Sequence, residues 1–151
     1  MNWWIFLSFI AGASLPIQAG ANMSLRTSLG SPMTAALVSF TAGMLLLLIL
    51  CLVFRVPVPT VESMKSVAPW AWFAGGLSGA LVVTTTVVAA PRIGIALTLV
   101  CIIVGQMLVS TVCDHFGAFG VPKQPVSLPK LAGIVLMIGG AALVKLAPAA
   151  K

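Results

Sequence analysis

Five long apolar runs dominate this 151-residue chain, and each is approximately long enough to cross a membrane as a helix. A helix needs about 20 apolar residues to span the hydrocarbon core of a bilayer. The runs cover approximately residues 3–23, 33–54, 70–90, 93–113 and 131–146. The fifth run is short for a span, so we expect its helix to begin earlier. The sequence predicts an all-α integral membrane protein with five transmembrane helices in a single transmembrane domain, residues 1–151.

The charge content supports this fold class. Charged residues make up 7% of the chain, whereas a soluble domain has about 25%. This small number of charged residues cannot cover a protein surface in water. We therefore expect the chain to lie in the lipid bilayer. The net charge is +6, but the basic residues are scattered along the chain. They form no patch that could follow a phosphate backbone, and we expect no nucleic-acid partner.

No motif for catalysis, for a cofactor or for a metal is present. The chain lacks GxSxG, HExxH and P-loop sequences and has no set of paired carboxylates. Cys51, Cys101 and Cys113 have no CxxC spacing, and His115 is the single histidine. We therefore expect that the protein is not an enzyme and has no catalytic residue, cofactor or metal site.

The basic residues divide evenly between the two sides of the membrane. Five spans place the termini on opposite sides of the membrane. The N-terminal side carries four basic residues, which are Arg55, Lys65, Lys123 and Lys130. The C-terminal side also carries four, which are Arg26, Arg92, Lys145 and Lys151. An excess of Lys and Arg in the cytoplasmic loops normally sets the orientation. In a small protein, equal numbers of basic residues on the two sides can arise by chance. Alternatively, the chain inserts both ways and forms an antiparallel homodimer, which has the inverted-repeat architecture of many secondary transporters.

Two rows of polar residues interrupt the first and fourth spans. Within each row the residues are four apart and so lie on one face of a helix. The rows are Ser14, Gln18 and Asn22, and Gln106, Ser110 and Asp114. Polar side chains find no water in the hydrocarbon core, so each row must face another helix or a wet cavity. Hydrogen bonding between helices would explain one such residue, but two rows favour a shared solute path.

The two acidic residues limit the chemistry of that path. Glu62 lies in a long loop, and Asp114 lies at the end of the fourth span beside His115. Asp114 and His115 are a candidate proton relay or gate, and the alternative for Asp114 is a helix-end capping or interface role. Exchange of cations through a buried carboxylate needs an acid within the membrane. Its absence favours a neutral, zwitterionic or anionic solute.

Several short sequence motifs occur along the chain, and their combination is typical of one protein family. They are Gln18 and Asn22 followed by Leu25-Arg26, WFAGGLSG at 72–79, APRIG at 90–94, GQMLVSTVCDHFG at 105–117 and a Gly-rich last helix. Together they resemble the half-size, five-span YdcZ-like family of the drug/metabolite transporter superfamily, over nearly the whole chain. The resemblance implies a multi-pass protein of the bacterial inner (plasma) membrane. Its relatives occur singly, as oppositely oriented pairs or as fused, double-length chains.

We therefore expect a secondary transporter subunit that moves a small metabolite or drug-like solute by alternating access as an antiparallel homodimer. Gln18, Asn22 and Gln106 would line the solute site, together with Ser14 and Ser110. Two alternatives stay open: a non-transporting accessory or assembly subunit, whose polar rows merely join helices, and a passive pore. Saturable, competable flux in liposomes distinguishes a transporter from both.

Overall fold

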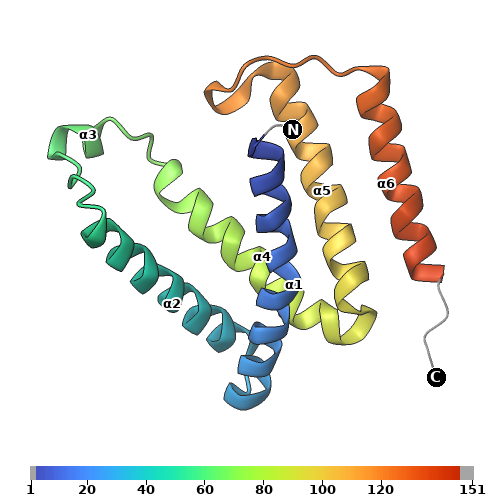
Figure 1. Ribbon diagram of the computed structural model, residues 1–151, viewed down its shortest axis with the longest axis horizontal. Coiled ribbons are helices and arrows are strands. Elements are labelled where there is room, and N and C mark those ends of the chain that lie inside the picture. Colours follow the sequence, from blue (N-terminus) through green and yellow to red (C-terminus); the bar gives the residue numbers. More distant parts are fainter. Residues whose placement is uncertain (1–2, 147–151) are drawn as a thin grey trace. The chain divides into compact units, whose positions relative to one another are not determined.

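The computed structural model describes residues 3–146, and these are folded as helices without any strand (Figure 1). Within this range five helices are long and apolar enough to cross a membrane. They are α1 (Trp3–Leu29), α2 (Pro32–Val53), α4 (Ala71–Ile93), α5 (Ile95–Phe116) and α6 (Leu128–Leu146). Two short helices, α3 (Val61–Lys65) and η1 (Ala118–Gly120), lie in the connections. The predicted all-helical fold with five candidate spans is confirmed.

The turn between α1 and α2 is shorter than predicted. The apolar runs at 3–23 and 33–54 left residues 24–32 between the spans, but α1 continues through Arg26 and ends at Leu29. Gly30 then adopts the left-handed conformation, with φ +75°, which commonly ends a helix. Ser31 caps α2 by accepting a hydrogen bond from the Thr34 N–H at 3.4 Å. The chain thus reverses over two residues, because its breakers are concentrated at that point.

The connection between α4 and α5 is also shorter than predicted. The apolar runs at 70–90 and 93–113 left residues 91–92 between the spans, but Pro91 lies inside α4, and Gly94 with φ +87° separates the two helices. A proline in a helix has no N–H for the carbonyl four residues earlier. In α4 that carbonyl belongs to Val87, so Val87 needs a hydrogen-bond donor from elsewhere.

The segment between α5 and α6 folds back on the end of α5. Gly117 ends α5 in the left-handed conformation, with φ +67°. The carbonyl of Asp114 accepts hydrogen bonds from the Gly117 N–H at 3.2 Å and from the Gln124 N–H at 2.8 Å. The last span begins at Leu128, earlier than residue 131, as its short apolar run suggested.

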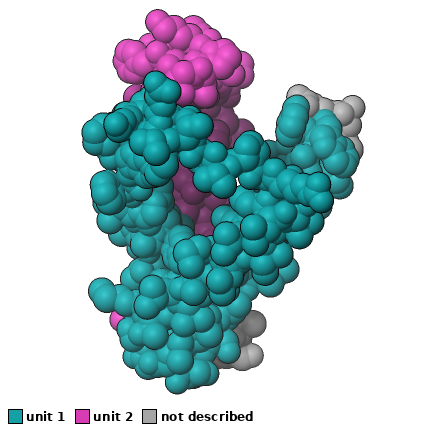
Figure 2. All heavy atoms as spheres, turned by 90° about the vertical axis from the view of Figure 1, so that its left-hand side faces the viewer, with its two compact units in different colours: residues 1–88 teal, residues 89–151 magenta. Residues whose placement is uncertain are grey.

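The chain divides into two compact units, unit 1 (Met1–Val88) and unit 2 (Ala89–Lys151), which are coloured separately in Figure 2. In unit 1, α1 packs on α2, and a small core joins Ala36 of α2 to Val83 and Val87 of α4. In unit 2, α5 packs on α6, and the two helices run side by side in Figure 1. The assignment of residues 1–151 to a single transmembrane domain stays a prediction.

Large apolar side chains are exposed along all five spans. Examples are Leu47 on α2, Leu81 on α4 and Leu136 on α6, which are 63%, 67% and 75% exposed. A protein surrounded by water rarely exposes so much apolar surface. These faces are suited to contact with lipid or with another membrane subunit.

Candidate functional site

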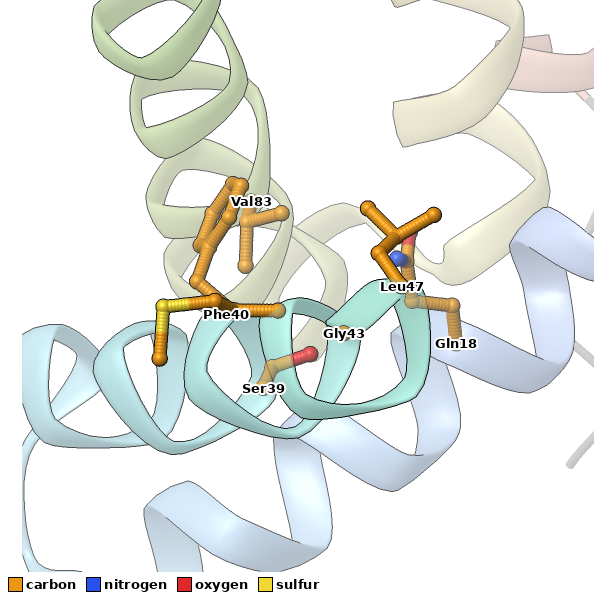
Figure 3. Close-up of a pocket in the computed structure, with 7 residues that line it drawn as sticks. Gln18, Ser39, Phe40, Gly43, Leu47 and Val83 are labelled. Atoms are coloured by element: carbon orange, nitrogen blue, oxygen red, sulfur yellow. The ribbon is translucent and has the colours of Figure 1, made fainter. Parts of the chain in front are cut away.

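A cavity of about 450 Å³ lies between α1, α2 and α4 within unit 1 (Figure 3). Its lining comes from one residue of α1, five of α2 and one of α4: Gln18, then Ser39, Phe40, Gly43, Met44 and Leu47, then Val83. Figure 3 shows Phe40 and Val83 on one side of the cavity and Gln18 and Leu47 on the other. A largely apolar wall with a few polar groups is typical of sites for small organic molecules, and the volume is in their usual range.

The helix α2 supplies most of the lining because its five residues recur with helical spacing and so share one face. Gly43 leaves room on this face, since a Cβ there would meet no atom within 4 Å. Gly79 of α4, in contrast, leaves no room for a side chain. A Cβ on Gly79 would lie 3.0 Å from Cζ of Phe40, so a larger residue there would displace the aromatic ring that lines the cavity.

The predicted polar row of α1 reaches this cavity through Gln18. Asn22, one turn further along the helix, is 3% exposed, so the row turns toward the interior of unit 1. Ser14 is exposed, and its hydroxyl donates to the carbonyl of Ala11 at 2.7 Å. Gln18 therefore has a position suited to a solute site, whereas the Ser14 hydroxyl is satisfied by its own helix. Asn22 is buried outside the cavity lining, and its place in a solute site stays a prediction.

The row continues one step beyond the residues singled out in the sequence. Arg26 follows Asn22 by four residues, and its Nη1 donates to the carbonyl of Val87 at 2.9 Å. This is the carbonyl that Pro91 leaves without a helical donor. Arg26 thus joins the end of α1 to α4. In the sequence, Arg26 was counted among the charges outside the spans, although its four-residue spacing from Asn22 indicates that it continues the row.

The polar row of α5 lies in unit 2 and has different surroundings. Gln106 and Ser110 are exposed, and the Ser110 hydroxyl donates to the carbonyls of Gln106 at 2.7 Å and of Met107 at 3.3 Å. The α1 and α5 rows belong to separate units, so a solute path formed by both rows stays a prediction.

Asp114 and His115 have separate partners. Oδ2 of Asp114 lies 3.7 Å from Nζ of Lys130, which also donates to Gln124 at 3.4 Å. Nδ1 of His115 accepts a hydrogen bond from the Val126 N–H at 3.2 Å. The Asp114 side chain thus links α5 to α6, and His115 fastens the α5–α6 connection to α5. Their role as a proton relay or gate stays a prediction.

Most of the cavity residues gave no signal in the sequence. Ser39 was visible as a polar residue within an apolar run, but a lone serine can satisfy its hydroxyl on its own helix. Phe40, Met44 and Leu47 have the same chemistry as residues that face lipid. Among the described residues no group of three or more His, Cys, Asp or Glu side chains is placed to hold a metal ion.

Comparison with known proteins agrees with the resemblance noted in the sequence. A family described as "Putative inner membrane exporter, YdcZ" matches residues 3–143. The match begins at the first residue of α1 and extends into α6, so it includes the cavity and both polar rows. No curated protein and no solved structure matches the chain.

Proposed function

This chain belongs to the YdcZ family of the drug/metabolite transporter superfamily, as a multi-pass inner-membrane protein, and we propose that it is a subunit of a secondary transporter. In this proposal it moves a small metabolite or drug-like solute across the bacterial inner membrane by alternating access. It changes no covalent bond, and it needs neither a cofactor nor a metal.

The observation that carries this proposal is the cavity between α1, α2 and α4. The amide of Gln18 and the hydroxyl of Ser39 supply hydrogen-bonding groups within walls that are otherwise apolar. Neither Asp114 nor Glu62 lines it, so a bound organic cation would find no carboxylate there. A neutral, zwitterionic or anionic solute fits this lining better.

The proposed working form is an antiparallel homodimer. Two features support it: the equal numbers of Lys and Arg on the two sides of the five spans, and the exposed apolar faces of those spans. Gln106 and Ser110, which are exposed in unit 2, would complete the solute path in the dimer. Equal numbers of Lys and Arg on the two sides give neither orientation an advantage during insertion.

Flux through purified protein tests the transport proposal. The full chain is reconstituted in liposomes, and counterflow is measured with radiolabelled glycerol, leucine, lactate and benzoate, which cover the three solute classes. We expect saturable, competable uptake of at least one compound. Flux that rises linearly with concentration would indicate a pore, and the absence of flux for every class would favour an accessory or assembly subunit.

Two substitutions test whether the cavity carries the flux. Gly43→Leu places a side chain into the open space of the cavity, whereas Gly12→Leu places one on an exposed part of α1 that does not line it. We expect Gly43→Leu to abolish flux and Gly12→Leu to preserve it. Equal flux in both variants would place the solute path elsewhere.

The dual orientation has its own test. Reporters active solely in the cytoplasm or solely in the periplasm are attached to the C-terminus in separate fusions, and we expect signal from both. Two additional lysines at either end should fix one orientation, because a small charge bias decides a balanced insertion. Signal from a single reporter would rule out an antiparallel homodimer of this chain.

A further inference from the structure

The polar row of α1 ends in a cation. Ser14, Gln18, Asn22 and Arg26 follow one another at intervals of four residues, and Arg26 is half-buried. The row therefore leads from the amide that lines the cavity, past the buried amide of Asn22, to a guanidinium group. On α4 the cavity wall is Val83, and the carbonyl that holds Arg26 is that of Val87, one helical turn or about 5.4 Å away.

The contact with Val87 orients the guanidinium without neutralising it. The carbonyl of Val87 accepts one N–H of Arg26, at 2.9 Å, and bears no formal charge. A guanidinium has further N–H groups in a fixed plane, and these match the geometry of a carboxylate or a phosphate. The gap that Pro91 leaves in α4 thus holds Arg26 in position, and the remaining donors are able to bind an anion.

No carboxylate within the described residues forms an ion pair with Arg26. Of the two acids, Asp114 pairs with Lys130. Glu62 lies in α3, in the connection between α2 and α4, whereas Arg26 lies in the last turn of α1, next to the connection between α1 and α2. The length of α2, about 30 Å, separates these two connections. A half-buried cation without a counter-ion favours binding of an anion from outside the chain.

We propose that Arg26 recognises the anionic group of the transported solute, and that the solute is a small organic anion with an apolar body. This inference rests on the proposed transport function and narrows its solute class. The apolar body would occupy the cavity beside Phe40 and Val83, with the amides of Gln18 and Asn22 between it and the charge. Charge-assisted hydrogen bonds from Arg26 to a carboxylate are stronger than those to a neutral carbonyl.

The test compares carboxylates with neutral amides of the same shape. The full chain is placed in phosphatidylcholine nanodiscs, and the affinities of butanoate, phenylacetate and indole-3-acetate are measured by calorimetry against those of their primary amides. We expect at least one carboxylate to bind about tenfold more tightly than its amide. Arg26→Gln should remove that preference, and the control Arg92→Gln, in the last turn of α4, should retain it.

A second pair of variants separates anion binding from the contact with α4. Pro91→Ala restores the backbone N–H that bonds the Val87 carbonyl, so Arg26 is no longer needed to satisfy it. If Arg26 binds the anion, Arg26→Gln still removes the carboxylate preference in the Pro91→Ala background. If the preference survives in the double variant, Arg26 acts through Val87 alone, and the inference is wrong.

The remaining outcomes distinguish this inference from the transport proposal. If no carboxylate is preferred while leucine or glycerol shows saturable flux, the transport proposal stands and the anion assignment falls. If no compound binds or moves, both fail. If added phosphatidylglycerol displaces the carboxylates through Arg26 and no carboxylate shows flux, the guanidinium binds a lipid headgroup, which overturns the assignment to a solute.

Discussion

The polar rows of α1 and α5 have the same spacing but different surroundings. Gln18 of α1 lines a cavity that two further helices, α2 and α4, help to form. Gln106 of α5 is exposed within a unit in which α5 packs on α6. Both glutamines are exposed, but three helices can form a hollow between them, whereas a pair leaves its outer faces open. The same polar pattern therefore forms part of a cavity in one unit and an open face in the other, which another subunit would have to cover.

The largest expected effect tests whether the two rows act together. We expect Gln18→Ala and Gln106→Ala each to reduce solute binding at least tenfold, because each change would leave a polar group of the bound solute without its hydrogen-bond partner, which costs about 1–3 kcal/mol once the solute is out of water. The dimer should still purify intact, since hydrogen bonds between membrane helices average about 0.6 kcal/mol. Solute affinity and dimer mass are measured on the same preparations.

A loss of binding confined to Gln18→Ala would show that the α1 row acts without the α5 row. Dissociation of the dimer with normal residual binding would show instead that the glutamines join helices. Ser8→Ala is a suitable control, because the Ser8 hydroxyl donates to Trp4 of its own helix at 2.8 Å and lies outside the cavity lining.

A smaller effect is expected at the end of the α5 row. Gly117 has φ +67°, and a Cβ there would lie 2.7 Å from Cγ of Lys123 and 3.2 Å from the carbonyl oxygen of Val121. Gly117→Ala should destabilise the protein by about 1–2 kcal/mol, because a side chain is unfavourable in the left-handed conformation. The decrease is measured by thermal unfolding in detergent.

Gly105→Ala is the matched control on the same helix. Gly105 lies within α5, and a Cβ there would meet no atom within 4 Å. Alanine is favoured over glycine in a helix by about 1 kcal/mol, so this variant should be as stable as the wild type or slightly more so. Equal destabilisation by both changes would mean that the α5–α6 connection does not depend on the Gly117 turn.

The smallest expected effect concerns the ion pair between Asp114 and Lys130. The distance is 3.7 Å and both side chains are partly exposed, so the pair should contribute less than about 1 kcal/mol. Asp114→Asn and Lys130→Gln should therefore change thermal stability slightly and equally. If Asp114 has an interface role alone, neither change alters flux driven by a pH gradient. If Asp114→Asn alone stops that flux while solute exchange continues, Asp114 is a proton relay.

Local chemistry in the sequence determined the spans and most of their ends. A run of about 20 apolar residues has no other stable arrangement in a bilayer, because a helix satisfies its own backbone groups. Gly30, Gly94 and Gly117 end or separate helices by adopting positive φ, a property of the residue itself. The four-residue spacing of Ser14, Gln18 and Asn22 likewise placed them on one face before any neighbour was known.

Contacts between distant residues were decided by the tertiary structure. Pro91 suggested the end of α4, yet the helix continues past it, and Arg26, 61 residues before Val87, supplies the missing hydrogen bond. Val83 of α4 is buried and lines a cavity, whereas Phe73 on the same helix is 74% exposed. The sequence could not separate them, because apolar side chains are equally suited to lipid and to a cavity wall. Helix packing determines which of the two each one meets.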